Sequence, residues 1–523
     1  MRRSPESVPA ERSAHAEHAD PARAATDSRA GERADHAVGW QQWLAPNWRF
    51  LWTLTLLAVV TRLLWVLFVH PPGGYVFSDM RLYVLRAASL AEHGISPSRN
   101  LAWQAFGTHY ILSIPYFLLG HEPISVSWFG EKPWIVQHVL GAIIFGLCSA
   151  GAVVLTYLVA LRLFARQWMA RAAGIVALCW YPNLSTAGFF LSEPPFLLFN
   201  LWTTYCLIRV LQEGKRALAA GVLGGVAFMV RPQSAIFLAL AFLIWLVNCL
   251  RLPRVRLRHI ALLAIPLACA LAFSLWRFHV HTGYWGGIAE NANMNLTAAR
   301  CHNIVTQAFK NKRQLLKSKR HGNTRDGRRV SLPGYRSLSK RVRDSSIIGL
   351  RPAMGGTTIR FVGYIGDPEI NKRVRAECYR RTGVVEQLRY SMVNLGLQWF
   401  IAKQWPTNER GRKYFLPITE LYRYLFQVFV LIPSLIGLGG ALRRVRGDPV
   451  RALVAANLLS ICIIAAVFFG DPRLRTPYDP YALLLALPVY FALWRWYRAR
   501  RAAKDSGSPA EPASASSSSG DVS

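Results

Sequence analysis

The sequence predicts an all-α polytopic membrane protein, a bundle of about ten transmembrane helices with a long extracytoplasmic loop. The amount and the arrangement of apolar residues support this prediction. Hydrophobic residues make up 52% of the 523, and stretches such as Trp134–Phe164, Ala217–Leu250 and Ile260–Phe278 run almost without charge. About 20 apolar residues cross a hydrocarbon core about 30 Å thick as a helix. Soluble domains do not bury so many runs of this length.

The expected spans follow one another between two polar ends of the chain. The fifth and sixth are short and meet at Arg231-Pro232-Gln233, so they could instead form one bent hairpin. The run His109–Leu119 is shorter still, and we expect an interfacial helix there. The spans, in order, are Arg49–Val69, Trp134–Leu163, Ala172–Phe190, Pro194–Leu211, Leu218–Val230, Ser234–Leu250, Ile260–Phe278, Leu421–Leu442, Ala452–Phe469 and Tyr481–Tyr497.

These spans define the expected domain organisation. Residues 1–47 lack apolar periodicity and a secretory h-region, so we expect a disordered cytoplasmic arm. The Ser-rich residues 498–523 are expected to form a disordered tail. Between these ends lie an N-terminal transmembrane module at 48–278, with a first extracytoplasmic loop at 70–133, a basic loop region at 279–420 and C-terminal transmembrane helices at 421–497.

Basic clusters predict the orientation in the membrane. They occupy every second connection between spans, and the positive-inside rule makes that side cytoplasmic, together with both termini. The region 279–420 is also basic but falls outside, which the rule permits because long domains translocate largely regardless of charge. The clusters are Arg162, Arg166 and Arg171; Arg209, Lys215 and Arg216; Arg251, Arg254, Arg256 and Arg258; Arg443, Arg444 and Arg446; and Arg495, Arg498, Arg500 and Arg501.

The net charge of +34 is therefore explained by topology rather than by nucleic-acid binding. Basic residues beside a membrane orient the spans and attract anionic lipids. We expect the inner (plasma) membrane as the location and membrane lipids as partners, with no nucleic acid.

Most of the eight cysteines suit buried apolar positions. Only Cys301 and Cys378 fall in the 279–420 region, where an oxidising periplasm would permit them to pair. The others (Cys148, Cys179, Cys206, Cys249, Cys269 and Cys462) lie within apolar runs and are expected to be small buried hydrophobes. The sequence contains no CxxC and no His/Cys metal spacing.

Acids and arginines gather in the extracytoplasmic connections. Asp79 and Glu193 are lone acids, and Arg231, Arg473 and Arg475 are on the same predicted face of the bilayer. Ionisable residues at membrane depth cost roughly 2.5–3.5 kcal/mol, so they usually have a function or a partner. A carboxylate can take a proton from an incoming hydroxyl, and arginines can hold phosphate oxygens through charge-assisted contacts.

Each candidate also has a structural interpretation. Asp79 could pair with Arg81 or Arg86 at an interface. Glu193 could cap the fourth span, because Ser-Glu-Pro is a helix start. Arg231 could be a snorkelling arginine at a helix end.

The remaining candidates have simpler interpretations as well. Arg473 and Arg475 could be topology charges, although they fall on the wrong side for that. His109 and His302 are more simply ordinary loop histidines.

These residues resemble motifs of the membrane glycosyltransferases of the GT-C superfamily, family 39 above all, which includes protein O-mannosyltransferases and lipid A aminoarabinose transferases. The likeness runs over residues 48–497. It rests on four passages in the family's order: Ser78-Asp79-Met80-Arg81-Leu82-Tyr83, Leu191-Ser192-Glu193-Pro194-Pro195-Phe196, the Gly-rich Gly224–Pro232 ending in Arg-Pro, and Phe469–Tyr478.

The resemblance implies transfer of a sugar from a polyprenyl-phosphate donor to an extracytoplasmic lipid, glycan or protein acceptor, usually with inversion, by a catalytic module at 48–278. By this likeness Asp79 and Glu193 are the catalytic acids, and Arg231, with Arg473 and Arg475, contacts the donor phosphate. Secondary candidates are Arg81, Tyr83, His109 and Tyr478.

The sequence departs from the family pattern in two places. Met80 stands where many members have a second acid, so no cofactor is predicted and a divalent metal is left open. Gly107-Thr108-His109-Tyr110 replaces the Glu-Lys-Pro stretch of the aminoarabinose transferases.

Other functional classes are a transporter or flippase for lipid-linked glycans, a ligase or polymerase that moves a whole glycan, and a non-catalytic scaffold. Transporters tend to show internal repeats and broken helices at the midplane. This sequence shows no repeat, and its polar residues gather at one face.

Overall fold

The computed structural model describes residues 47–126, 134–249, 257–301, 305–309, 328–330, 358–362, 367–401 and 412–505. The chain divides into two compact units, Met1–Trp52 and Thr53–Ser523. The described part of the first unit is the beginning of helix α3, where the rings of Trp48 and Trp52 meet edge to face at 5.1 Å. All further description concerns the second unit.

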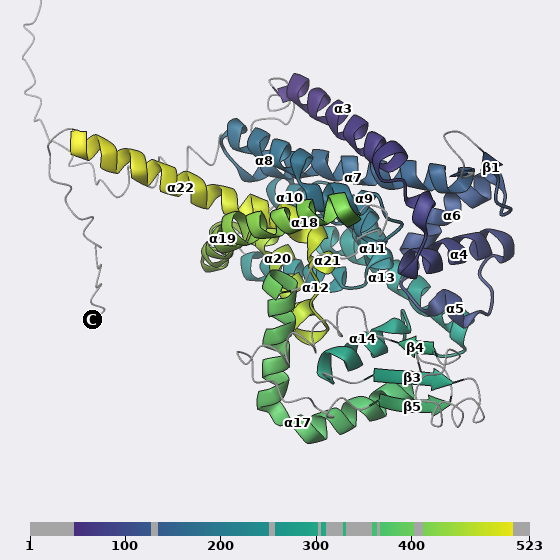
Figure 1. Ribbon diagram of the computed structural model, residues 1–523. Helices are drawn as coiled ribbons and strands as arrows, with labels where there is room; N and C mark the ends of the chain where they lie inside the picture. Colours follow the sequence, from purple (N-terminus) through teal and green to yellow (C-terminus); the bar gives the residue numbers. More distant parts are fainter. Residues whose placement is uncertain are drawn as a thin grey trace, which may run out of the picture. The chain divides into compact units, whose positions relative to one another are not determined.

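The elements are mainly helices (Figure 1). The first half contains α3 (Trp48–Leu64), a π-helical turn Trp65–Val69, a 3-10 turn Pro72–Tyr75, α4 (Ser78–His93), α5 (Arg99–Ala102), α6 (Gly107–Leu119), β1 (Ser125–Val126), β2 (Trp134–Ile135), α7 (Val136–Leu163), α8 (Gln167–Cys179), α9 (Tyr181–Ala187), α10 (Glu193–Glu213), α11 (Ala217–Val230), α12 (Ser234–Asn248) and α13 (Leu257–Thr282).

The second half begins with short elements and ends in long helices. It contains α14 (Asn291–Arg300), β3 (Val305–Phe309), β4 (Arg328–Val330), β5 (Thr358–Val362), α17 (Pro368–Gly396), a π-helical turn Leu397–Ile401, α18 (Arg412–Leu425), a π-helical segment Phe426–Leu431, α19 (Ile432–Arg443), α20 (Pro449–Val467), α21 (Pro472–Arg475), a 3-10 turn Thr476–Tyr478 and α22 (Asp479–Asp505).

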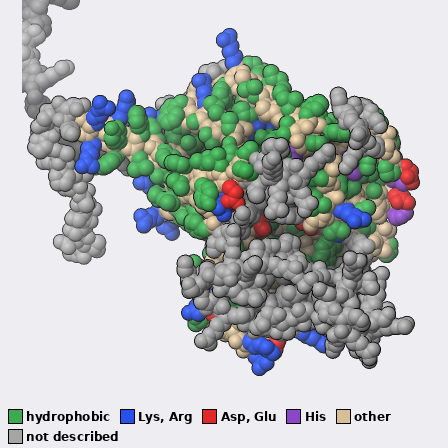
Figure 2. Space-filling model, in the orientation of Figure 1, with side chains coloured by type: hydrophobic (Ala, Val, Ile, Leu, Met, Phe, Trp, Pro, Cys, Tyr) green, Lys and Arg blue, Asp and Glu red, His purple; other side chains and the backbone are tan. Residues whose placement is uncertain are grey.

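Five of the described helical segments are long and apolar enough to cross a membrane: Trp48–Tyr75, Val136–Leu163, Leu257–Thr282, Pro417–Arg443 and Pro449–Val467. α11 and α12 are apolar but shorter. Hydrophobic side chains cover much of the helical face in Figure 2, and large ones such as Phe68, Ile265 and Ile436 are more than half exposed. An apolar surface of this extent suits a lipid environment. The predicted all-α polytopic membrane class is confirmed, while the number of spans stays a prediction.

Two predicted boundaries change in the structure. The run Ala172–Phe190 is not one span, because α8 ends at Cys179 and α9 starts at Tyr181, with Trp180 extended between them. Pro182 lies in the first turn of α9, where its missing N–H is tolerated. α11 and α12 are separate helices, and the break between them begins at Arg231, where the fifth and sixth predicted spans meet. α22 continues to Asp505, beyond the predicted start of the tail at 498.

Helices α7, α10, α11 and α13 pack in series, and α20 packs against α10, α12, α17 and α22. α11 approaches α13 closely because Gly221 has no side chain: a Cβ there would meet the Leu263 carbonyl oxygen at 2.6 Å. A buried polar network joins α10, α20 and α22, in which Asn200 donates to Asn457 at 2.8 Å and to the Tyr481 hydroxyl at 3.0 Å.

The predicted 279–420 region has a folded part. α13 runs into it as far as Thr282, and α14 then packs against α17, which kinks at Gly383 (φ 69°). A small sheet has the strand order β4-β3-β5, with β3 antiparallel to β4 and parallel to β5. A disulfide joins Cys301 to Cys378, and the other six cysteines are free. Most of Lys310–Arg343 lies outside the described residues.

Candidate functional site

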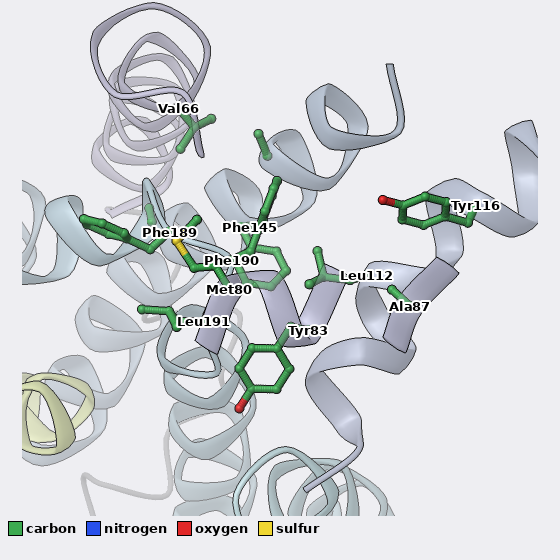
Figure 3. Packing of buried hydrophobic residues seen from close by; sticks show 12 residues of the cluster. Val66, Met80, Tyr83, Ala87, Leu112, Tyr116, Phe145, Phe189, Phe190 and Leu191 are labelled. Carbon is green, nitrogen blue, oxygen red and sulfur yellow. The ribbon is translucent and has the colours of Figure 1, made fainter. Parts of the chain in front are cut away.

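Asp79 lies in the first turn of α4, where the positive end of the helix dipole favours a carboxylate. The preceding Ser78 has φ 48°, a left-handed conformation that is costly for a residue with a Cβ. The buried neighbours Met80 and Tyr83 belong to a hydrophobic cluster with Phe145 and Phe190, among others (Figure 3). This packing fixes α4 and hence the place of Asp79.

Glu193 begins α10 and its side chain is only 1% exposed. One carboxylate oxygen, Oε1, accepts hydrogen bonds from two arginines: Arg231 Nη2 at 2.5 Å and Arg473 Nε at 2.5 Å. Arg231 ends α11, and its Nε donates to the Ser192 hydroxyl at 2.8 Å. A single buried acid therefore holds two guanidinium groups from distant parts of the chain.

Arg473 connects the two acids. Its Nη1 donates to Asp79 Oδ2 at 3.0 Å while its Nε donates to Glu193. It lies on the single-turn helix α21, whose N-cap is Asp471: the Asp471 carboxylate accepts from the Arg473 backbone N–H at 2.8 Å. Burial tends to lower the pKa of Arg473, but the carboxylates of Glu193 and Asp79 outweigh it and raise that pKa. Burial raises the pKa of Asp471 to about 6, although its backbone hydrogen bond and Arg473 act in the opposite direction.

Exposure separates the roles of these four side chains. Asp79 is 33% exposed, against 12% for Arg473, 7% for Arg231 and 1% for Glu193. Asp79 is thus the carboxylate that an incoming molecule can reach, while Glu193 lies behind the arginines. Among the described residues, Arg231 Nη1 and Glu193 Oε2 have no hydrogen-bond partner, and neither does the buried hydroxyl of Ser234, whose backbone N–H donates to the Arg231 carbonyl oxygen.

The structure therefore brings together Asp79, Glu193, Arg231 and Arg473. The ion pair of Asp79 is with Arg473, not with Arg81 or Arg86 as the simpler interpretation held. Arg81 is exposed, and Arg86 donates to Gln104 Oε1 at 2.6 Å.

Arg475 does not join this cluster, contrary to its prediction as a phosphate contact. It is 3% exposed, donates to Asp479 at 3.0 Å and places its guanidinium 3.7 Å from the centre of the Phe426 ring. The reason is helical geometry: residues two apart are rotated by about 200°, so Arg473 and Arg475 point to opposite sides of α21.

Arg81 apart, the secondary candidates are buried: Tyr83, His109 and Tyr478. Tyr83 lies close enough to Asp79 and Arg473 to feel their charges; burial first, and then Asp79, raise its pKa. The hydroxyl of Tyr478 receives a hydrogen bond from Gln233 at 3.4 Å. His109 is buried in α6 rather than in a loop, and burial, together with nearby Arg86, lowers its pKa. His302 lies outside the described residues.

Sequence reasoning did not single out Ser192, Ser234 or Asp471. Ser192 and Asp471 lie in the quoted passages and carry a local signal, because Ser or Asp just before a helix that starts with Pro is typical of an N-cap. Ser234 has no such signal and is brought here by the break between α11 and α12. The described residues contain no group of three or more His, Cys, Asp or Glu that could hold a metal ion.

Comparison with known proteins agrees with the motifs. Residues 125–276 match the family model described as dolichyl-phosphate-mannose-protein mannosyltransferase, and no curated protein matches the chain.

Solved structures with similarity to the chain have low identity. The apo oligosaccharyltransferase of Archaeoglobus fulgidus is 10% identical, with 88% of this chain and 52% of that chain covered and a TM-score of 0.43. The chain thus spans about half the length of that protein. ArnT of Cupriavidus metallidurans is 13% identical in its apo state (85% and 78% covered, TM-score 0.34) and 12% identical bound to undecaprenyl phosphate (86% and 78%, TM-score 0.32). The family match confirms, for residues 125–276, the resemblance to the protein mannosyltransferases among the membrane glycosyltransferases.

Proposed function

We propose that this protein is a glycosyltransferase that moves a sugar from a polyprenyl-phosphate donor to a hydroxyl of an extracytoplasmic acceptor, with inversion at the anomeric carbon. The observation that carries the proposal is the bridge made by Arg473 between a reachable carboxylate, Asp79, and a buried one, Glu193. The family match over residues 125–276, which includes Glu193 and Arg231, supports it.

The donor phosphate is assigned to the arginines. Arg231 has a buried Nη1 without a hydrogen-bond partner among the described residues. The hydroxyl of Ser234, at the start of α12, is also buried and has no such partner. The N-terminus of a helix and arginine N–H groups both favour phosphate oxygens. As the bond between the sugar and the phosphate breaks, negative charge grows on the leaving phosphate, and fixed cations in a buried site stabilise it.

Charge balance gives Arg473 a second role. Two carboxylates, Asp79 and Glu193, face two guanidinium groups, Arg231 and Arg473, so the charges of these four side chains balance before an anion arrives. A phosphate brings negative charge and competes for Arg473 with Asp79, which is the more exposed carboxylate. Binding of the donor would release Asp79 from its ion pair.

Asp79 is then placed to act as the base. Its carboxylate accepts the proton of the acceptor hydroxyl, the acceptor oxygen forms a bond to the anomeric carbon, and polyprenyl phosphate leaves with the bonding electrons. Glu193, a catalytic acid by the family likeness, is reassigned to a positioning residue, because its side chain is 1% exposed and both of its arginine contacts use one oxygen.

The orientation proposed from the sequence places this site at the extracytoplasmic surface. The connections that carry Asp79, Glu193, Arg231 and Arg473 alternate with the basic ones, which the positive-inside rule assigns to the cytoplasm together with both termini.

The test compares purified wild type with Asp79→Asn for release of polyprenyl phosphate from a panel of polyprenyl-phosphate sugars, with acceptor-containing membranes supplied. Glu92→Gln is the matched control, because Glu92 is an exposed carboxylate on the same helix, α4. Turnover by wild type and the control but not by Asp79→Asn supports the proposal. Turnover by all three contradicts the role of Asp79, and no turnover by any, with lipid-linked glycan crossing a liposome bilayer, favours a transporter.

A further inference from the structure

The C-terminal end of α20 and the loop after it lead to α21, which carries Arg473, and a separate pair of helices contacts both the helix end and the loop. Those helices are α14 and α17, in the region between α13 and α18. Nothing in the sequence motifs links this region to the candidate site.

Arg300, the last residue of α14, makes the main contact. Its guanidinium is 8% exposed and donates to the Val467 carbonyl oxygen from Nε at 3.0 Å and from Nη2 at 2.7 Å, and also to the Ala466 carbonyl oxygen. From Nη1 it donates to the hydroxyl of Ser391 on α17 at 3.0 Å. A cation at the C-terminal end of a helix satisfies carbonyl groups that lack helical partners and lies at the negative end of the dipole.

α17 also contacts the loop that follows α20. Asn394, also on α17, donates to the Phe468 carbonyl oxygen at 2.8 Å. Gly470 is buried so closely against Asn394 that any Cβ at position 470 would collide with the Asn394 carbonyl oxygen. Only two residues then separate Gly470 from Arg473, and the first of them is Asp471, which caps α21.

A disulfide joins the end of α14 to α17. Cys301 directly follows Arg300 and is joined to Cys378 on α17, within a small core that includes Val374 and Tyr390. Both cysteines are fully buried. The bond ties the end of α14, and with it Arg300, to the helix that supplies Ser391 and Asn394.

From these contacts we propose that Arg300 is a positioning residue for Arg473, and that the Cys301–Cys378 disulfide holds Arg300 in place, so that full activity requires an oxidised protein. The inference rests on the proposed function, since it assigns Arg300 a role in that reaction. Loss of Arg300 frees the end of α20 and the loop, and Arg473 then bridges Asp79 and Glu193 less often.

The first experiment measures how accessible position 474 is to a thiol reagent, and it does not rely on activity. Leu474→Cys, a half-buried position next to Arg473, is alkylated with a maleimide in membranes, and the rate is read by mass spectrometry on the peptide that carries position 474. We expect Arg300→Gln to raise this rate several-fold. Arg375→Gln is the matched control, because Arg375 also joins α17 to α14, but through Asn293 and Thr297.

Kinetics supply a second measurement. Arg300→Gln should lower kcat for sugar transfer about 10- to 100-fold, the size expected for a misplaced catalytic group. In an Arg473→Gln background the same change should have no further effect, because Arg300 acts through Arg473. Arg300→Lys should recover only part of the loss, since lysine lacks the planar fork that reaches two carbonyl groups.

Reduction tests the disulfide with Cys301 and Cys378 both in place, in the wild type for kcat and in the Leu474→Cys protein for alkylation, so the result does not depend on a cysteine-free variant that fails to fold. A phosphine reductant should raise the alkylation rate at 474 and lower kcat, while a Cys301→Ser/Cys378→Ser protein should not respond. An unchanged alkylation rate in both Arg300→Gln and the reduced protein overturns the inference even if transfer occurs. If wild type transfers no sugar but alkylation rises as expected, the proposed function fails and the positioning contact stands.

Discussion

Replacing Glu193 with Gln tests the claim that this acid anchors two arginines rather than acting on substrate. The substitution keeps the size of the side chain and removes its charge. In the wild type one oxygen of Glu193 accepts from Arg231 and from Arg473, both at 2.5 Å, in surroundings where the acid is 1% exposed. After the change, Arg473 keeps its ion pair with Asp79, while Arg231 loses the carboxylate that it contacts.

The expected cost follows from burial. Removing one partner of a buried ion pair costs about 3 to 5 kcal/mol, because the remaining charge stays in a poorly solvated place. Asp79→Asn breaks an ion pair too, but that carboxylate is 33% exposed, and a pair open to solvent is worth about 1 kcal/mol or less. We therefore expect Glu193→Gln to be much less stable than Asp79→Asn, although both lose activity.

The assay is thermal unfolding of detergent-purified protein followed by aggregation and by tryptophan fluorescence. A loss of several kcal/mol lowers the apparent Tm by a few degrees. Glu377→Gln is the matched control, because Glu377 also accepts from two arginines, Arg380 and Arg381, but at an exposed position on α17. The control should unfold at the wild-type temperature.

Two results would refute this reasoning. If Glu193→Gln unfolds at the wild-type temperature, the acid does not anchor the arginines. If Glu193→Gln is stable but inactive while Asp79→Asn keeps full turnover, Glu193 is the base and the roles assigned from exposure are reversed.

Three further predictions concern local structure. Ser78→Gly should be neutral or stabilising by up to about 1 kcal/mol because φ is 48° there, whereas Ser78→Val should destabilise; thermal unfolding of both variants checks this. Asp471→Asn should remove a titration near pH 6, because the raised pKa of Asp471 favours the protonated acid in the folded protein. The stability of the wild type relative to the variant should therefore decrease as the pH rises from about 4 to about 6, and a difference that does not change with pH would contradict this. Asn457→Ala should cost about 1 to 3 kcal/mol in the same unfolding assay, because Asn200 and Thr204 lose a buried partner, and a wild-type Tm would show that the network is not stabilising.

The sequence by itself determined the class of fold and the general region of the site. Long apolar runs are sufficient for the class, because a bilayer requires helices that bury their own backbone groups over about 20 residues. One local signal was also reliable: the break between α11 and α12 at Arg231-Pro232 depends only on neighbouring residues. The pairing considered for Cys301 and Cys378, by contrast, needed the structure, since sequence cannot show that two cysteines 77 residues apart meet.

Only the tertiary structure decided which charges face one another. Arg473 reaches Glu193 across 280 positions in the chain and Asp79 across 394, while the near neighbours Arg81 and Arg86 do not pair with Asp79. Arg473 and Arg475 have different partners because their side chains point in different directions from a one-turn helix. The hydrogen bonds to the Val467 carbonyl oxygen come from Arg300, on a helix with no recognisable motif. Such contacts depend on how helices pack over long separations, and no local pattern of residues encodes that packing.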